Sequence, residues 1–240
     1  MADITLSYKS TTIATMSASG SKTIQTAGKY CEDDISLTYI SANPNDTSEP
    51  ALPSLYKRLE YLDYEPSIGI LVDLATADYM LLMADFMSRK TSTGESVAIG
   101  YRQSTTNPND FRIGAAATTM LSKVSSTGQG LSVRDGLSYT PRSRVTGKIV
   151  LVSPRNQALI GRYDHYEGGT YVGASALDGR IYQIKCINLD TLGICNWFVP
   201  CRKVEDNTLG FFDHVTQIFY STTYPGDSAT GTITAGPDVN

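Results

Sequence analysis

The last quarter of the chain alternates apolar and polar residues with a period of two, and this alternation constrains the fold more than any other feature. Tyr182, Ile184 and Cys186 fall on one side of the pattern, whereas Gln183 and Lys185 fall on the other. Successive side chains of a strand point to opposite faces of its sheet. The segment therefore predicts a half-buried strand.

A second segment repeats this alternation further along the chain. Trp197, Val199 and Cys201 occupy one side, and Arg202 and Lys203 follow at its end. Glycine, asparagine, aspartate and threonine separate the two runs, as turns between strands require. No acid, base or nucleophile in this stretch has a catalytic arrangement, so the pattern favours a binding or structural role over an enzyme.

Size and composition also favour strands. The 240 residues suffice for one large β domain, or for a large and a small one, with a core that is stable without disulfide or metal cross-links. Charged residues make up 18% of the chain, less than the usual share of about a quarter. Serine, threonine, glycine and tyrosine take their place, and this mixture is typical of strands and turns.

The charge and hydropathy exclude some partners. A net charge of -4 lacks the basic surface that nucleic-acid binding requires, so no nucleic-acid partner is expected. No apolar run reaches the roughly 20 residues that span a bilayer, and Met1–Ile4 lacks the basic start of a signal peptide. We therefore expect a protein made in a cytoplasm, without a membrane partner.

The cysteine and histidine content argues against a zinc site. The chain holds four cysteines and two histidines, at Cys31, Cys186, Cys195, Cys201, His165 and His214. No Cys-x-x-Cys pair occurs among them. Cys186 and Cys201 fit apolar strand positions, which predicts reduced thiols in the core. A disulfide between two of the last three cysteines remains an alternative.

The chain divides into three parts. Residues 1–42 predict a small β module of four short strands. It buries too little apolar surface to be stable alone and must pack against the main domain, another subunit or a larger assembly. Residues 43–53 contain three prolines and several turn formers, and so form a linker. Residues 54–240 form the main domain.

The main domain predicts many short strands. The candidates are 59–62, 68–71, 80–87, 95–101, 111–114, 130–134, 148–152 and 159–163. The stretch 74–90 fits either an amphipathic helix or a central strand, because short apolar runs are not settled by their period alone. Turn signals recur at hairpin spacing, for example at 107–110 and 135–136. This arrangement predicts a sandwich of two sheets.

Two motifs at the ends of the main domain resemble a known family. Residues 52–62 read Leu-Pro-Ser-Leu-Tyr-Lys-Arg-Leu-Glu-Tyr-Leu, and 198–203 read Phe-Val-Pro-Cys-Arg-Lys, followed by Gly-Phe-Phe-Asp-His-Val-Thr-Gln-Ile-Phe-Tyr at 210–220. They resemble the opening and closing strands of concanavalin A-like, laminin-G-type jelly-roll domains of phage and gut-bacterial proteins. The resemblance spans about residues 52–238 and implies an all-β, antiparallel jelly-roll sandwich. It also favours a strand over a helix for 79–86.

The first forty residues resemble a small module at the start of many phage structural proteins. The resemblance rests on Ile4-Thr-Leu-Ser-Tyr-Lys and on Ala27-Gly-Lys-Tyr-Cys-Glu-Asp-Asp-Ile. Together the two resemblances imply a virion protein with an attachment module, a linker and a lectin-like head. They imply other virion proteins as partners of the N-terminal module, and a homo-oligomer.

A tyrosine-rich segment supplies the candidate sugar-binding residues. Tyr163, Asp164, His165 and Tyr166 combine aromatic rings with polar groups in one predicted loop, as carbohydrate sites do. The alternative interpretation is that Tyr163 and Tyr171 flank a hairpin and pack as cross-strand pairs.

No catalytic residues and no cofactor are expected. A retaining glycosidase needs two carboxyl groups about 5–5.5 Å apart. The acidic cluster at 32–34 lies in the small module, and Glu60, Asp63 and Glu65 have the wrong spacing. No Gly-x-Ser-x-Gly elbow supports a serine nucleophile. Calcium remains an alternative at three acidic residues of the main domain, Asp164, Glu167 and Asp178.

The stretch 134–144 is locally basic. A solvated hairpin is the ordinary interpretation of such a cluster, and contact with an acidic neighbouring subunit is the alternative.

These observations predict a non-enzymatic virion protein on the tail, baseplate or capsid surface that adheres to host or mucosal glycans. Many weak sites on one particle would raise the avidity without new contacts. The alternatives are a purely structural decoration or scaffold subunit that binds only protein, and a glycoside hydrolase.

Overall fold

The computed structural model is all-β over the residues that it describes. These are residues 3–8, 11–17, 35–40, 49–66, 68–92, 94–101, 111–124, 130–132, 135–154, 156–167, 170–225 and 231–239. Every paired strand in them is antiparallel to its neighbours. No helix in these ranges is long and apolar enough to cross a membrane.

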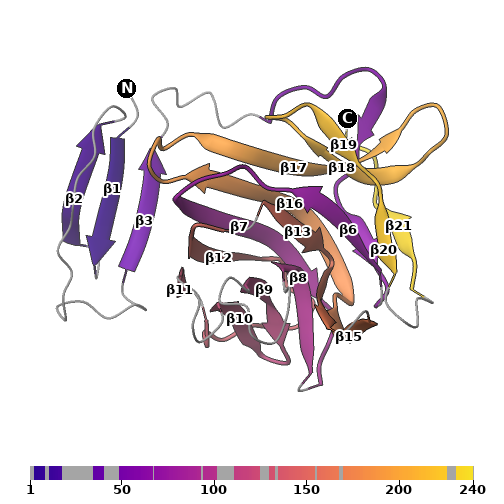
Figure 1. Ribbon diagram of the computed structural model, residues 1–240, viewed down its shortest axis with the longest axis horizontal. Coiled ribbons are helices and arrows are strands. Elements are labelled where there is room, and N and C mark those ends of the chain that lie inside the picture. The colour runs from indigo at the N-terminus through magenta and orange to yellow at the C-terminus, as the bar shows by residue number, and fades with distance from the viewer. Residues whose placement is uncertain are drawn as a thin grey trace.

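The strands form two large sheets, one of ten strands (the large sheet) and one of six strands (the back sheet), and two small sheets (Figure 1). The large sheet has the order β11 (Gly130–Ser132), β12 (Val145–Val152), β7 (Tyr79–Ser88), β16 (Gly179–Asn188), β17 (Ile194–Lys203), β18 (Leu209–Asp213) and β19 (Ile218–Tyr220). Three further strands join it: β4 (Tyr56–Arg58) pairs with the end of β17, β5 (Leu62–Tyr64) pairs with the start of β16, and β21 (Ile233–Ala235) pairs with β5. The back sheet has the order β10 (Thr119–Val124), β9 (Phe111–Ala116), β8 (Glu95–Tyr101), β13 (Gln157–Ile160), β6 (Ile68–Asp73) and β20 (Thr223–Pro225). A hairpin is formed by β14 (Arg162–Glu167) and β15 (Thr170–Ala176).

The large sheet and the back sheet share one hydrophobic core. Phe86 and Ile184 of the large sheet and Ile99 and Ile113 of the back sheet belong to the same buried cluster and are fully shielded from solvent. Two antiparallel sheets packed face to face on one core make a β-sandwich. The predicted all-β, antiparallel architecture is therefore confirmed.

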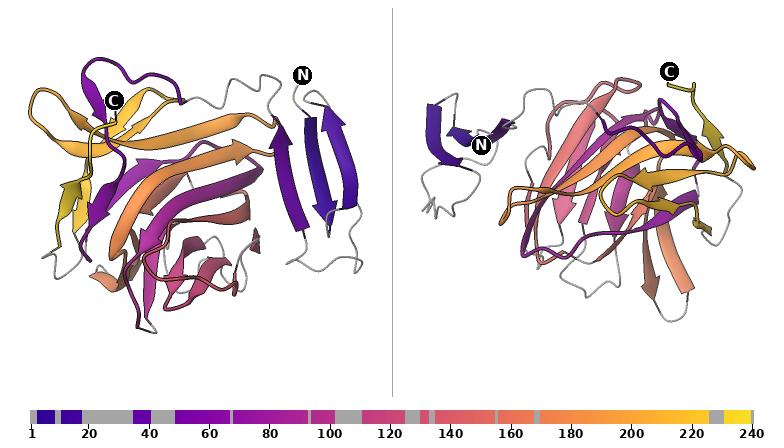
Figure 2. Two further views of the ribbon diagram at one scale, coloured as in Figure 1. Left: turned by 180° about the vertical axis from the view of Figure 1, so that it is seen from behind. Right: turned by 90° about the horizontal axis from the view of Figure 1, so that it is seen from above.

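The ambiguous segment 74–90 contains strand β7, not a helix. Met80, Leu82, Ala84 and Phe86 alternate toward the core, so the segment has the period of two that a strand requires. It pairs with β12 on one side and β16 on the other, and the three long strands β7, β16 and β17 lie side by side (Figures 1 and 2). A position in the middle of the sheet explains why the segment is so apolar.

Strand β16 departs from the predicted alternation at Tyr182. Ile181, Ile184 and Cys186 belong to the main core, but Tyr182 does not. The register between β16 and β7 shifts between Ile181 and Gln183, so Tyr182 is the extra residue of a β-bulge. Its ring packs edge-on against Tyr61 instead, with ring centroids 5.6 Å apart.

Strand β17 is buried on both faces, not on one. Phe198 faces the main core, whereas Trp197, Val199 and Cys201 form a second cluster with Phe212 on the opposite face. Three partly buried residues, Leu52, Tyr56 and Phe219, pack against this second cluster. The opening motif at 52–62 thus covers one end of the outer face of the large sheet and also supplies Leu59 and Leu62 to the main core.

One predicted strand is divided by a turn, and one strand was not predicted. The candidate strand 159–163 is divided by Gly161, whose φ of 88° marks a turn between β13 and β14. Strand β10 at 119–124 was not expected from the pattern. It pairs with β9 through a tight turn at residues 117–118.

The N-terminal part forms a sheet of its own, with the order β2 (Thr11–Ser17), β1 (Asp3–Tyr8) and β3 (Ile35–Ile40). Three strands of this part lie within the described residues, whereas four were expected in residues 1–42. The fourth expected strand and linker residues 43–48 lie outside the described residues. Within the described ranges, no strand of this sheet is paired with a strand of the sandwich.

Replacing Gly161 by alanine should destabilise the domain. A Cβ atom there would overlap the ring of the fully buried Tyr64, and the backbone has a positive φ. We expect Gly161→Ala to lower the free energy of unfolding by about 2–4 kcal/mol, measured by urea denaturation. Gly136→Ala is the matched control, because its φ is 75° and no atom lies within 4 Å of the added Cβ. It should cost only the backbone term of about 1–2 kcal/mol, and equal losses in the two variants would contradict the proposed overlap.

Candidate functional site

The outer face of the large sheet, which points away from the shared core, contains a polar hollow. Its volume is about 270 Å³, and it is lined by Met83 and Asp85 of β7, Thr146 and Lys148 of β12, and Gln183 and Lys185 of β16. These residues alternate with core residues along the same strands. The alternation that builds the core therefore also points these side chains outward.

The strand register arranges the lining residues in two rows. Thr146 and Gln183 both pair with Asp85 from the two neighbouring strands, and Lys148 and Lys185 both pair with Met83. Directly paired residues place their side chains on the same face of a sheet, about 4.5–5.5 Å apart. The hollow is thus a small patch of three adjacent strands with a carboxylate in one row and two ammonium groups in the other.

Asp85 is held as an anion. Its carboxylate accepts hydrogen bonds from the Thr146 hydroxyl, from Gln183 Nε2 at 2.9 Å and from Arg144 Nη2 at 3.1 Å. Burial acts to raise the pKa of Asp85, but these three hydrogen bonds and the Arg144 charge outweigh it and lower the pKa. A carboxyl group with a lowered pKa does not serve as a general acid near neutral pH.

Lys185 contacts an aromatic ring on the same face. Its Nζ lies 3.8 Å from the centroid of the Trp197 ring, which is a cation–π contact. The Trp197 Nε1 donates to Gln183 Oε1 at 3.1 Å, and so orients the amide of Gln183 toward Asp85. Burial lowers the pKa of Lys185. The three side chains fix one another's positions at the edge of the hollow.

Beyond Trp197, the outer face is closed by a buried histidine. The His214 ring packs edge-on against Trp197 at 5.5 Å, and its Nε2 lies 3.5 Å from Glu49 Oε1. Glu49 also forms an ion pair with Arg58 of β4. Burial opposes ionisation of Glu49, but the hydrogen bonds from His214 and Arg58 lower its pKa overall. These contacts tie Glu49, a residue of the predicted linker, to the large sheet.

The predicted sugar-binding residue Tyr163 lies in a different place. Its side chain is only 5% exposed and packs with Val97 and Leu121. Its hydroxyl accepts a hydrogen bond from Arg112 Nη1 at 3.0 Å, and the Arg112 guanidinium lies over its ring. A ring enclosed in this way has no free face for a sugar.

The other three predicted residues, Asp164, His165 and Tyr166, lie in strand β14 of the hairpin. Their side chains are outside the described part of the structure. In the backbone register Tyr166 is opposite Tyr171, whereas Tyr163 is opposite Ser175. The described lining of the hollow comes from β7, β12 and β16 and not from this hairpin.

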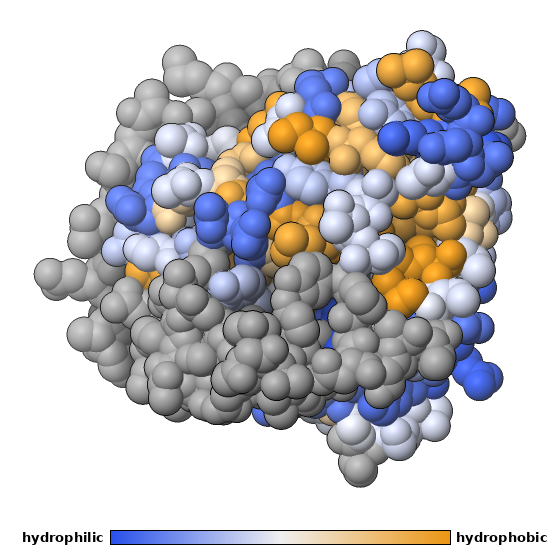
Figure 3. Space-filling model, turned by 45° about the vertical axis from the view of Figure 1, so that its right-hand side comes forward, coloured by the Kyte–Doolittle hydropathy of each residue, from blue (hydrophilic) through white to orange (hydrophobic). Residues whose placement is uncertain are grey.

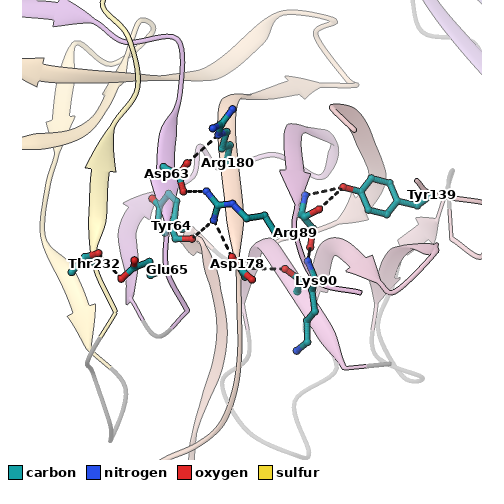
Figure 4. Close-up of polar contacts among 11 residues, drawn as sticks. Asp63, Tyr64, Glu65, Arg89, Lys90, Tyr139, Asp178, Arg180 and Thr232 are labelled. Carbon is teal, nitrogen blue, oxygen red and sulfur yellow. Dashed lines mark hydrogen bonds and ion pairs between the residues drawn. The ribbon is translucent and has the colours of Figure 1, made fainter. Parts of the chain in front are cut away.

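Asp63, considered for catalysis, and Asp178, considered for calcium, are bound by arginines. Figure 4 shows Asp63 between Arg89 and Arg180, and Asp178 Oδ1 accepts a hydrogen bond from Arg89 at 2.9 Å. The Arg89 guanidinium thus occupies the Asp178 carboxylate that a calcium ion would need as a ligand. Across the described residues, no group of three or more His, Cys, Asp and Glu side chains could hold a metal ion. Glu167, the third calcium candidate, has its side chain outside the described part.

Glu60, Asp63 and Glu65, the carboxylates of the main domain that were considered for hydrolysis, are not among the described residues that line the hollow. Glu60 and Glu65 are exposed, and Asp63 is taken up by two arginines. Asp85 is the one carboxylate in the described lining of the hollow. Acid–base hydrolysis of a glycoside uses two.

Cys186, Cys195 and Cys201 are free thiols, as the core interpretation predicted for the first and last of them. Cys186 and Cys201 are fully buried, one in each apolar cluster. Burial raises the pKa of Cys201 to about 12 and raises that of Cys186 as well. Buried thiols of this kind act as small apolar side chains.

Sequence reasoning missed Asp85, Arg144, Thr146 and Lys148. The apolar run of β7 conceals Asp85, because a buried central strand and an amphipathic helix give similar patterns. Arg144 belongs to the basic stretch expected to be a solvated hairpin, but its guanidinium binds Asp85 and lies 4.2 Å from the Tyr182 ring. A single charged residue within a long apolar strand is the signal that could have found Asp85.

No known protein family, curated protein or solved structure matches this chain. The features of the chain that point to a function are therefore the geometry of the hollow and the motifs at 52–62 and 198–220.

Replacing Asp85 should make stability less dependent on acid. A carboxyl group with a lowered folded pKa stabilises the fold above its ordinary pKa of 3.8, and this contribution is lost as the pH falls through the folded value. At pH 7 Asp85→Asn should unfold with about 1–2 kcal/mol less free energy than the unaltered chain.

Urea denaturation from pH 7 to pH 2.5 measures this difference, which should shrink steadily below pH 4. Asp78→Asn at an exposed position is the control and should stay within about 0.5 kcal/mol of the unaltered chain at every pH. A constant difference for Asp85→Asn would show that its carboxylate is not bound as described.

Proposed function

We propose that this protein is a carbohydrate-binding structural protein of a bacteriophage particle, and that its main domain is a concanavalin A-like jelly roll. The observation that carries the proposal is the polar hollow on the outer face of the large sheet. It presents hydrogen-bond donors and acceptors on rigid strands, beside the apolar side chain of Met83. Ligand sites typically combine a few fixed polar groups with apolar surface in this way.

The order of the strands supports the jelly-roll assignment. The chain passes from β6 in the back sheet to β7 in the large sheet and returns to β8 in the back sheet. It crosses again between β12 and β13, and between β19 and β20. Repeated exchange between two packed antiparallel sheets is the connectivity of jelly rolls, whereas simple meanders stay within one sheet.

The size of the hollow suits weak binding of a short saccharide segment. About 270 Å³ is near the lower end of small-molecule sites, and the hollow lies on the surface of a sheet instead of in a deep cleft. Such a site binds weakly in a single copy. Many copies on one particle would give firm adhesion to a glycan-coated surface, because linked sites raise the effective concentration.

The N-terminal sheet supports attachment to the particle. Three short strands give little apolar surface of their own, and a sheet this small requires another surface to be stable. We assign that surface to another virion protein or to the same module of neighbouring copies in a homo-oligomer. The main domain would then project its hollow away from the point of attachment.

A second candidate function is a subunit that binds only protein. It is favoured by exposed apolar side chains at one edge of the sandwich: Leu55 is 70% exposed and Val204 48% exposed, and their backbones are joined by a hydrogen bond. On the face drawn in Figure 3, however, apolar and polar patches alternate. Isolated apolar residues on a surface need no partner.

A glycan array tests the proposal directly. The full chain, displayed as a tetramer on labelled streptavidin, should bind at least one class of bacterial-surface or mucosal glycan. Met83→Trp should abolish this signal because the indole fills the hollow, and Met83 faces outward so that the core is undisturbed. Thr234→Trp at an exposed strand position is the control and should bind as the unaltered chain does. A silent array with a folded protein would favour the protein-only candidate.

The virion assignment has its own test. An antibody against the main domain should label tails, baseplates or capsids in electron micrographs of particles from the source phage. Antibody that labels host cells but never particles would overturn the assignment to a virion.

A further inference from the structure

The charges around the hollow do not balance. Asp85 is paired with Arg144 at 3.1 Å, and Glu49, the next carboxylate along this face, is paired with Arg58. Lys148 and Lys185 remain, and in the described part of the chain neither ammonium lies within 4.0 Å of a carboxylate. The lining therefore carries a surplus of positive charge although the whole chain has a net charge of -4.

The two lysines are placed to converge on one group. Both pair with Met83 in the strand register, one from β12 and one from β16. Two strand spacings, about 9.5 Å, separate their backbones. Each lysine has a flexible four-carbon stem, so both ammonium groups can reach an anion that lies above Met83.

Lys185 lacks a full partner for its charge. It is half-buried, its Nζ lies 3.8 Å from the centroid of the Trp197 ring, and the charges of Asp85 and Glu49 act on it only from beyond ion-pair distance. Removing an ammonium group from water without an ionic or hydrogen-bonded partner costs free energy, which a bound anion would recover. The row beside it, formed by Gln183 and Thr146, offers polar groups to the hydroxyls of the same ligand.

From this arrangement we propose that the hollow binds an acidic saccharide, with the carboxylate, sulfate or phosphate group of the sugar between Lys148 and Lys185. The inference rests on the proposed carbohydrate-binding function and names its class of ligand. It follows that neutral saccharides with the same ring should bind much more weakly.

The sole tryptophan of the chain gives a reading from the site itself. Because Lys185 lies on the Trp197 ring, an anion that draws the ammonium away should change the fluorescence of Trp197. The full chain is titrated with matched pairs: oligouronates and their carboxyl-reduced forms, and sulfated or phosphorylated oligosaccharides and their unmodified forms. Sodium sulfate and sodium phosphate are titrated alone to separate a saccharide site from a plain anion site.

We expect at least one acidic saccharide to bind about tenfold or more tightly than its neutral counterpart, as the gain of a charge-assisted contact implies. Lys148→Met and Lys185→Met should each remove this preference, whereas Lys148→Arg should keep it. Lys203→Met is the matched control, because Lys203 also lies over an aromatic ring, Phe219, at 5.4 Å, but is not part of the hollow's described lining. Thermal unfolding of each variant shows whether it is folded. If Lys185→Met does not fold, the comparison of Lys148→Met, which should lose the preference for the acidic saccharide, with Lys148→Arg, which should keep it, still tests the proposal.

The outcomes separate the two proposals. Equal binding of acidic and neutral saccharides, lost in Met83→Trp, would overturn the acidic preference and leave the carbohydrate function standing. Acidic saccharides that bind unchanged to both methionine variants, or sulfate alone that binds as tightly as any saccharide, would also overturn the inference. No response to any saccharide in the titration or on the array would remove the carbohydrate function and the inference with it.

Discussion

The structure depends on the burial of two opposed sheet faces against each other. In β7 the residues Met80, Leu82, Ala84 and Phe86 enter the shared core, and hydrophobic burial of such side chains is the main favourable term in folding. Because strand side chains alternate, the same burial turns Met83 and Asp85 to the opposite face. The position of the hollow is therefore a consequence of the core. Any shift of register by one residue would bury Asp85 and expose the core residues.

Two layers of contact hold the outer face in shape. Arg144 and Thr146 fix the Asp85 carboxylate from β12 and the loop before it, and Gln183 fixes it from β16. Trp197 then links Gln183 to Lys185 through its ring nitrogen and its π face. Since these groups satisfy one another on rigid strands, the hollow has its shape without a ligand, and this would lower the entropic cost of binding one.

The opening segment of the domain has a structural part that complements the closing strands. Leu52 and Tyr56 pack on the cluster of Trp197, Val199 and Cys201, and Glu49 is bound to His214 in the turn after β18. Residues about 150 positions apart in the sequence thus close one end of the outer face. Packing therefore explains the motifs at 52–62 and 198–220.

The sequence by itself determined the all-β, antiparallel architecture and the burial of Cys186 and Cys201, because period-two alternation and turn residues act locally, but it did not predict β10. The pattern predicted a hairpin near Tyr163 and suggested that this residue contacts a sugar. In the structure its ring is enclosed by packing with Val97 and Leu121. The bulge at Tyr182 and the second buried face of β17 were not predicted from the sequence either. Only the tertiary structure decided which strands became neighbours, and so which charges met. Asp85, Arg144 and Lys185 are far apart in the chain, and strand pairing brings them together.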